Sequence, residues 1–293
     1  MTKRLKLFVA LIAVLALVAA ACSDDDGADT TVAAGGGDTT PATEASGLPD
    51  LGGRTVTVGV ENAYLPFNYI PLGETEGTGW DYDMWDAICE LLNCVNDMVE
   101  SGWPAVIDQV ANDELDTAAD GISITDERKE IVDYSDAYMV VTQKLLVQLD
   151  DDRYDSAQAV FDDQDAKIGT QIGTTNYELI LTYVNESRVD AFDQFPLAIQ
   201  ALISGDVDAV IIDDAAGLGY VGENAEVLKT IDDPLQSDPL GFIFPQGSDL
   251  IDPVNQAIQV LKDNGTFEEL GRKYFTESFA VTYDDIEEIV IEE

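Results

Sequence analysis

The 293-residue sequence contains no histidine and few basic residues: 14 Lys and Arg stand against 58 Asp and Glu, for a formal net charge of −44. The absence of histidine excludes His-based catalytic triads and His-ligated zinc. The shortage of Lys and Arg argues against a nucleic-acid partner, since nucleic-acid affinity comes largely from basic contacts to phosphate. It also argues against docking on anionic lipid. We therefore expect a strongly solvated, acidic surface.

The first 22 residues begin basic and continue apolar. The uncharged apolar run that ends at Ala21 is short for a membrane span of about 20 residues and is typical of a secretory signal. Because small residues precede Cys22, residues 1–21 resemble a lipoprotein signal peptide, with Cys22 as the lipidated new N-terminus. Ala19 departs from the Leu usual at its position, so ordinary signal cleavage after Ala21 stays an alternative. Either way, the mature protein is expected to work outside the cytoplasm.

Acidic segments flank the predicted domain on both sides. Residues 23–52 lack apolar periodicity and are rich in Asp, Gly, Thr and Ala, so residues 22–52 are expected to be the lipidated cysteine and a flexible tether. Residues 281–293 alternate Ile and Val with acids and are expected to form an acidic tail or a late edge strand. Removing residues 1–21 takes away three basic and no acidic residues, so the formal charge changes from −44 to −47.

Cysteine is scarce as well, with three in the chain. With Cys22 assigned to the anchor, Cys89 and Cys94 are left as one pair. In an oxidising compartment this pair predicts a disulfide. Two cysteines alone make a poor metal site, and we expect neither a metal nor a cofactor.

Between Arg54 and Phe279 the chain alternates predicted strands and helices. Asp81 and Thr125 are candidate caps for two of the helices. This alternation predicts an α/β protein with mostly parallel sheets, and roughly 230 ordered residues approach the size at which one core gives way to two. The predicted strands cover 54–60, 116–124, 166–172 and 207–213; the predicted helices cover 80–92, 103–113, 125–132 and 252–265, with a last helix opened by a capping box at 266–269.

Open α/β sheets bind ligands at the carboxyl ends of their strands. One such end offers the Gly121 carbonyl, the Ser123 hydroxyl and the Arg128 guanidinium. Arg128 falls in the first turn of the predicted helix 125–132, where the helix dipole disfavours a cation. A ligand anion would explain this placement, although Arg128 could instead pair with acids on its own helix.

Two further strand ends complete a zwitterion site. Gly173, Thr174 and Thr175 lead from a strand into a helix, whose free backbone N–H groups can hold an anion. Asp213 and Asp214 end an apolar run, and Asp213 could hold an ammonium or serve as a simple cap; Asp214 is expected to be the bystander. A ligand carboxylate would then lie on Arg128 and near Thr174 and Thr175. The ligand ammonium would lie on Asp213, Ser123 and the Gly121 carbonyl.

In this order the motifs resemble the bacterial extracellular solute-binding proteins of family 3, the amino-acid receptors of ABC importers. The resemblance spans residues 54–276 and includes VENAYLPFNY, GWDYDMWDAI, GISITDERKEIVDYSDAYM, GTTNYE and VDAVIIDD. It implies a periplasmic-binding-protein type II fold, in which two α/β lobes joined by two crossing strands enclose a ligand cleft. The first lobe would comprise residues 53–143 and 237–280, and the second residues 144–236.

The resemblance also assigns residues to the site. Arg128, Ser123 and Thr175 match carboxylate-binding positions, and Asp213 matches the acid that holds the ammonium. The remaining matches surround the ligand side chain: Glu61, Tyr64 and Trp103.

Two features depart from the family pattern: the loop 73–79 is longer, and Asp120 stands where many relatives have a small or neutral residue. Under strict strand alternation, Gly121 and Ser123 lie on one face of the strand and Asp120 on the other, so Asp120 would point away from the pocket. If Asp120 faced it together with Glu61, a cationic ligand would be favoured.

The function implied is a monomeric, extracytoplasmic substrate-binding lipoprotein on the outer face of the cytoplasmic membrane. It would deliver a polar or basic L-amino acid, with acidic ones disfavoured, to an ABC transporter permease. Two alternatives stay open. A periplasmic dehydratase-like enzyme on the same fold would rely on Glu61, Asp120 or Asp213 for acid–base chemistry. A receptor that reports its ligand to a sensor protein would have the same sequence features.

Overall fold

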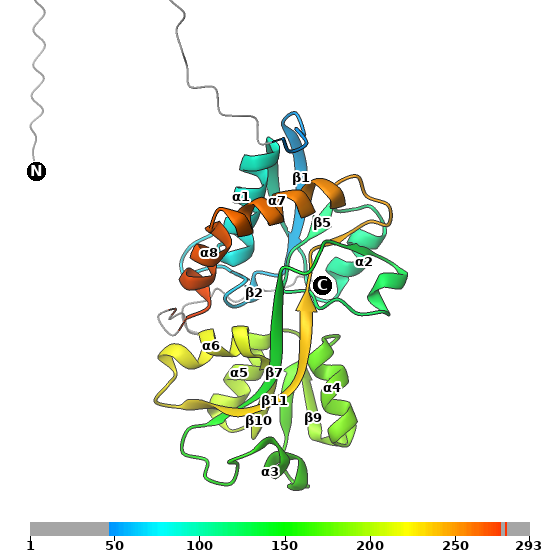
Figure 1. Ribbon diagram of the computed structural model, residues 1–293. Helices are drawn as coiled ribbons and strands as arrows, with labels where there is room; N and C mark the ends of the chain where they lie inside the picture. Colours follow the sequence, from blue (N-terminus) through cyan, green and yellow to red (C-terminus); the bar gives the residue numbers. More distant parts are fainter. Residues whose placement is uncertain (1–46, 277–278, 280–293) are drawn as a thin grey trace, which may run out of the picture. The chain divides into compact units, whose positions relative to one another are not determined.

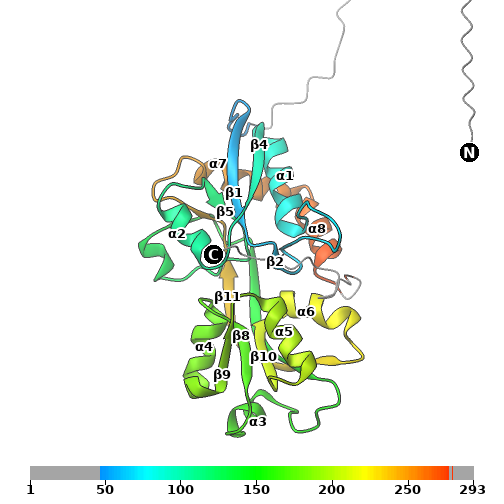
Figure 2. The ribbon, with the colours of Figure 1, turned by 180° about the vertical axis from the view of Figure 1, so that it is seen from behind.

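The computed structural model describes residues 47–276 and 279 (Figure 1). The signal peptide, Cys22, most of the tether and the tail 281–293 lie outside the described residues. Two five-stranded sheets form the framework, each with helices on both faces (Figures 1 and 2). We call the unit built on the first sheet lobe 1 and the unit built on the second sheet lobe 2.

Lobe 1 has the strand order β4-β1-β5-β12-β6. Its strands are β1 (Arg54–Val60), β4 (Cys94–Glu100), β5 (Thr117–Ala118), β6 (Asp133–Tyr134) and β12 (Ile243–Phe244). Strand β1 runs parallel to β4 and β5, and β12 runs antiparallel to β5 and β6. Four helices cover the sheet: α1 (Trp80–Leu92), α2 (Ala105–Ala111), α7 (Ile251–Asp263) and α8 (Thr266–Tyr274).

Alternation along β1 explains how lobe 1 buries both faces of its sheet. Val58 and Val60 pack in the core that α1 and α7 complete. Gly59 points to the other face, where Val106 of α2 and Leu115 approach so closely that no side chain would fit.

Lobe 2 has the strand order β11-β7-β10-β8-β9. In β10, Val210 and Ile212 pack with the helices of one face, while Ala209 and Ile211 pack in a separate cluster with those of the other. This double burial accounts for the continuous apolar run of the strand. The strands are β7 (Met139–Gln148), β8 (Ile168–Gln171), β9 (Val189–Phe192), β10 (Ala209–Asp213) and β11 (Leu228–Leu240); the helices are α3 (Ala157–Asp162), α4 (Thr175–Tyr183), α5 (Phe195–Ser204) and α6 (Asp214–Glu223).

Strands β7 and β11 cross between the lobes, as Figures 1 and 2 show. They pair antiparallel from Met139↔Leu240 to Gln148↔Leu228, with a register shift between Ile231 and Gln236. The two-lobed α/β fold with two crossing strands is thereby confirmed. The expectation of mostly parallel sheets is wrong in detail, because β7 is antiparallel to both of its neighbours and β12 to both of its own.

Two predicted elements are much shorter than expected. The strand 116–124 is reduced to β5, which ends at Ala118, and the φ of 55° at Gly121 prevents an extended conformation through to residue 124. Residues 125–132 form only a 3-10 turn, η1 (Arg128–Glu130), before β6 begins at Asp133. Short elements elsewhere are β2 (Ala63–Tyr64), β3 (Asn68–Tyr69) and η2 (Glu186–Arg188).

Two predicted caps are wrong and one is observed. Asp81 is fully buried and makes no cap, since loop carbonyls of Pro66 and Phe67 already accept the first amides of α1. Thr266 is the first residue of α8, and its N–H donates to the side chain of Asn264. Thr125 Oγ1 does accept from the backbone N–H of Arg128 at 3.1 Å.

Cys89 and Cys94 form a disulfide across the end of α1. Asn93 adopts the left-handed conformation there and turns the chain from α1 into β4. The turn leaves the two Cα atoms 4.5 Å apart.

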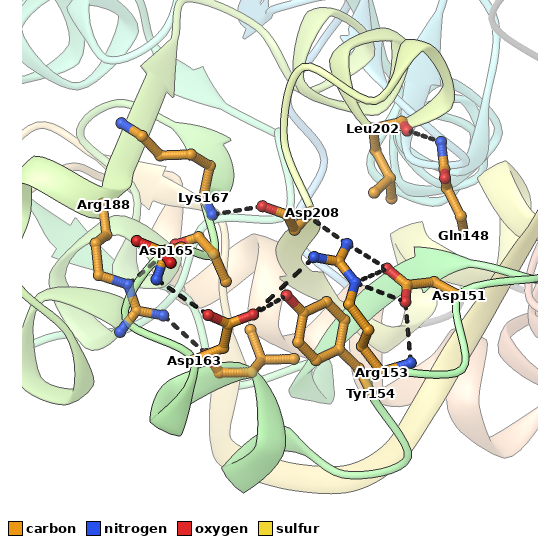
Figure 3. Close-up of polar contacts among 12 residues, drawn as sticks. Gln148, Asp151, Arg153, Tyr154, Asp163, Asp165, Lys167, Arg188, Leu202 and Asp208 are labelled. Atoms are coloured by element: carbon orange, nitrogen blue, oxygen red, sulfur yellow. Dashed lines mark hydrogen bonds and ion pairs between the residues drawn. The ribbon is translucent and has the colours of Figure 1, made fainter.

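Basic residues hold together the edge of lobe 2 at which β8, β9 and β10 begin (Figure 3). Arg153 pairs with Asp151 and Asp208 at 2.7 and 2.6 Å. Arg188 is buried and donates to three backbone carbonyls, those of Val160, Phe161 and Ala166. These arginines therefore have structural roles. No helix within residues 47–276 is both long and apolar enough to cross a membrane.

Candidate functional site

A small cavity of about 20 Å³ lies between the lobes. Loops that follow β1 and β5 line it from lobe 1, and the carboxyl ends of β8 and β10 line it from lobe 2. The structure brings all ten sequence-predicted ligand residues together here: Glu61, Tyr64, Trp103, Asp120, Gly121, Ser123, Arg128, Thr174, Thr175 and Asp213.

Arg128 brings a positive charge to the cavity without a carboxylate partner. It takes part in none of the ion pairs of the described chain. Its guanidinium donates instead to the Ser123 carbonyl at 3.1 Å and the Gly173 carbonyl at 3.3 Å, and lies 5.0 Å from the ring centre of Trp103. Burial lowers the pKa of Arg128, which shows that the charge is held at a cost. An anion in the cavity would offset that cost.

Asp213, the last residue of β10, brings a carboxyl group to the cavity. It is buried, and its two oxygens accept from the Tyr64 hydroxyl at 2.7 Å and the Asn176 amide at 3.1 Å. Burial raises the pKa of Asp213 to about 6, although both hydrogen bonds lower it. The group is therefore mostly ionised at neutral pH, with no cation bound among the described residues.

Hydroxyl groups from both lobes meet beside Arg128. Ser123 Oγ lies 3.2 Å from Thr175 Oγ1, which also accepts from the Gln143 amide at 3.1 Å. Thr174 caps α4, since its Oγ1 accepts from the backbone N–H of Tyr177 at 3.1 Å. The free N–H groups at the start of α4 add to this anion-holding end of the cavity.

The opposite end of the cavity is aromatic and acidic. Tyr64 stacks between Phe67 and Phe195, with ring centres 5.3 Å away on each side. Glu61 is buried and accepts from the Gln171 amide of lobe 2 at 2.6 Å. Burial and the nearby charge of Asp120 raise the pKa of Glu61 well above its usual range.

Asp120 faces the cavity, so the inference from strict alternation is wrong. Strand β5 ends at Ala118, and alternation does not extend past it. At Gly121 the positive φ is required, and a Cβ would also lie 2.7 Å from the Tyr64 ring. This glycine therefore lets the chain turn tightly against Tyr64 and carry Asp120 inward.

Sequence reasoning missed three residues that line the cavity: Gln171, Asn176 and Phe195. Gln171 ends β8 and is a polar residue at a strand end, the signal that singled out Asp213. Asn176 lies in the first turn of α4, and Phe195 begins α5 after a short loop. Their roles depend on closure of lobe 2 over lobe 1, which local patterns do not encode.

Comparison with known proteins agrees with this geometry. Residues 56–277 match the family described as bacterial extracellular solute-binding proteins, family 3. A probable histidine-binding protein of Campylobacter jejuni is 27% identical over 222 residues, which cover 75% of this chain and 84% of the relative.

Solved structures show the same fold. The arginine-, lysine-, histidine-binding protein of Geobacillus stearothermophilus has a TM-score of 0.70 and 31% identity, covering 76% of this chain and 95% of that one. An ancestral amino acid-binding protein, described as a precursor of cyclohexadienyl dehydratase, has a TM-score of 0.71 and 29% identity, covering 76% and 96%.

Proposed function

The chain belongs to the bacterial extracellular solute-binding proteins, family 3, and on that premise we propose that it captures an amino acid for an ABC importer. One observation carries the proposal: a single cavity is lined by a half-buried arginine, Arg128, and a buried aspartate, Asp213, and neither forms an ion pair with a residue that the structure describes. The two unpaired charges complement the two charges of a free amino acid. Each charge would gain a buried partner on binding.

In the proposed complex, the ligand carboxylate lies on Arg128, Ser123, Thr174 and Thr175. The ligand ammonium lies on Asp213, with the Gly121 carbonyl and the Ser123 hydroxyl beside it. Tyr64 would keep its hydroxyl on Asp213 and so orient the carboxylate toward the ammonium.

The ligand side chain would occupy the end formed by Glu61, Tyr64, Trp103 and Asp120. Two acids in this space favour a polar or basic amino acid and disfavour glutamate and aspartate. The relatives from Campylobacter and Geobacillus, whose names state histidine or basic amino acids as ligands, support this preference.

In the cell envelope, Cys22 would carry lipid and residues 22–52 would tether the two lobes to the outer face of the cytoplasmic membrane. Lobe 1 would comprise residues 53–143 and 237–280, and lobe 2 residues 144–236. The monomer would deliver its ligand to an ABC transporter permease.

A catalytic role is the second candidate. It is favoured by the similarity to the ancestral dehydratase precursor and by acids in the cavity whose pKa values lie near neutrality. We give preference to binding, since the paired complementary charges need no reaction to explain them. Turnover of prephenate-like substrates by the purified protein would reverse this preference. Neighbouring permease and ATPase genes would separate an importer component from a sensory receptor.

A thermal-shift screen of the mature protein against all proteinogenic amino acids tests the proposed function. A ligand that binds only the folded state stabilises it by about 2.7 kcal/mol at a hundredfold excess over Kd. We expect one or a few polar or basic amino acids to raise the melting temperature. No response to any amino acid would refute the proposal, and a response to glutamate alone would refute the side-chain preference.

A further inference from the structure

Three buried acids lie at the side-chain end of the cavity and behind it. Glu61 and Asp120 line the cavity and are 3% and 4% exposed, while Asp81 of α1 lies deeper and is 0% exposed. None of the three takes part in an ion pair with the Lys and Arg residues that the structure describes. Buried carboxylates without cations are unstable and tend to hold protons instead.

Asn68 joins Asp81 to Asp120. Its side-chain nitrogen donates to Asp81 Oδ2 at 2.9 Å and to Asp120 Oδ1 at 2.7 Å. Its side-chain oxygen accepts from the backbone N–H of Asn62 at 2.6 Å, which fixes the orientation of the amide. Both amide hydrogens must therefore point at carboxyl groups. Asp81 takes one hydrogen and so directs Asn68 to hold Asp120 at the cavity wall.

The same cluster contains too much negative charge to ionise fully. Burial raises the pKa of Asp120 to about 7 and that of Asp81 to about 8, and the charge of Asp120 adds to the effect on Asp81. The backbone N–H of Glu61 and the amide of Asn68 oppose the effect at Asp120. The titratable groups that face these acids are tyrosines and one further aspartate, with Arg128 across the cavity: Tyr64, Tyr82, Tyr138, Tyr220 and Asp213.

None of these neighbours neutralises Asp120. Burial raises the pKa values of Tyr64 and Tyr138 well above their usual range, so both phenols stay uncharged. Arg128 lies at the other end, against the carbonyls of Ser123 and Gly173. A cation that stabilises the ionised form of Asp120 must therefore come with the ligand.

We propose that Asp120 is the specificity-determining residue for a cationic ligand side chain and exchanges its proton for that cation on binding. Asn68 and Asp81 are the positioning residues that hold it. The inference rests on the proposed function. The ligand carboxylate and ammonium are matched by Arg128 and Asp213, so one side-chain cation is left for one ionised Asp120. A cationic amino acid thus releases about one proton more than a neutral amino acid of the same shape.

L-Arginine and L-citrulline provide the matched pair, since they share length and shape and differ in side-chain charge. Calorimetric titrations at pH 6, in buffers of different ionisation enthalpy, count the protons released. Protons that Asp213 gives up to the ligand ammonium are common to both ligands and cancel in the difference. We expect arginine to release about one more proton than citrulline. The ratio of the affinity for arginine to that for citrulline should rise with pH, by up to about tenfold per pH unit, until about pH 7. Equal proton counts would overturn the inference.

Variants separate the roles. Asp120→Asn should lower arginine affinity about thirtyfold or more, change citrulline affinity less than about threefold, and abolish the difference in proton release. Asn68→Leu removes the hydrogen bond that favours ionised Asp120, so the pH at which the arginine preference levels off should rise. Asp97→Asn, at an exposed position of β4, is the charge-matched control and should change neither ligand.

The outcomes are distinct. If Asp120→Asn keeps the arginine preference, Asp120 does not determine specificity and the inference fails, whether or not Asn68→Leu folds. Binding of another neutral amino acid, without response to arginine or citrulline, would overturn the inference and leave the proposed function standing. Absence of binding to any amino acid would defeat both.

Discussion

The replacement Asp81→Asn tests whether the deepest acid of the cluster carries a proton in the folded protein. Asp81 is fully buried on α1; its Oδ2 accepts from Asn68, and its Oδ1 has no partner among the described residues. Burial, with the charge of Asp120, raises its pKa from 3.8 to about 8. Asparagine has the shape of the protonated acid and keeps an acceptor for Asn68. Its NH₂ group takes the place of an O–H that is equally unpartnered.

The sign of the effect follows from proton counting. An acid with a raised folded-state pKa binds more protons folded than unfolded between the two pKa values. The free energy of unfolding therefore falls as pH rises through that window. Between pH 3.8 and about 8, Asp81 should cost roughly 1.4 kcal/mol of stability per pH unit, roughly 6 kcal/mol in all. Asparagine does not titrate. The variant should match the wild type near pH 4 and exceed its stability by several kcal/mol at pH 8.

Urea unfolding followed by tryptophan fluorescence, at several pH values from 4 to 8.5, measures this difference. Asp97→Asn removes the same formal charge from an exposed site and corrects for the general effect of the acidic surface. Its stability difference from the wild type should stay nearly constant with pH. If the Asp81→Asn curve ran parallel to the wild-type curve as well, Asp81 would be ionised in the folded protein, and the reasoning would be refuted.

Three further predictions concern the site and the disulfide. Arg128→Ala should lower amino-acid affinity roughly thirtyfold or more with the circular-dichroism spectrum unchanged, since removing one partner of a buried charge pair costs about 2–5 kcal/mol; near wild-type affinity by calorimetry would reject the zwitterion site. Asp213→Asn should weaken the amino acid far more than its deaminated analogue, and equal losses would indicate a structural role. Cys89 and Cys94 should add no alkyl group in intact-mass analysis without reductant. Reducing their bond should cost up to about 2–3 kcal/mol because its loop is short.

Segments with long, regular periodicity were predicted well from the sequence. The helix expected at 80–92 is α1 (Trp80–Leu92), and the strand expected at 54–60 is β1 (Arg54–Val60). Both bury a continuous apolar face, so local pattern and tertiary packing favour the same structure. The predictions for segment 116–132 were wrong because local pattern and tertiary packing do not agree there. Its conformation is set by contacts with distant residues, such as the bridge between Ser123 and Leu240 of β11.

The candidate site shows the same division. Residues at predicted strand ends, such as Ser123 and Asp213, were found because the rule for open sheets needs only the order of elements. The orientation of Asp120 could not be predicted, since it depends on a positive φ at the next residue and on a two-residue strand. Nothing in the sequence around Asn68 indicated that it belongs to the site. Its importance comes from two carboxyl groups 13 and 52 residues away in sequence.

Charged side chains are paired at the edge of lobe 2 but not in the cavity. At the edge of lobe 2 where β8, β9 and β10 begin, Arg153 is paired with the carboxylates of Asp151 and Asp208. In the cavity, burial raises the pKa values of Asp120 and Asp213, and neither acid forms an ion pair with a Lys or Arg that the structure describes, so the folded state is weakened as pH rises. Because a bound cationic amino acid would remove this imbalance, its stabilising effect should grow with pH across the window in which Asp120 ionises. The same acids would then account both for the instability of the empty site and for its choice of ligand.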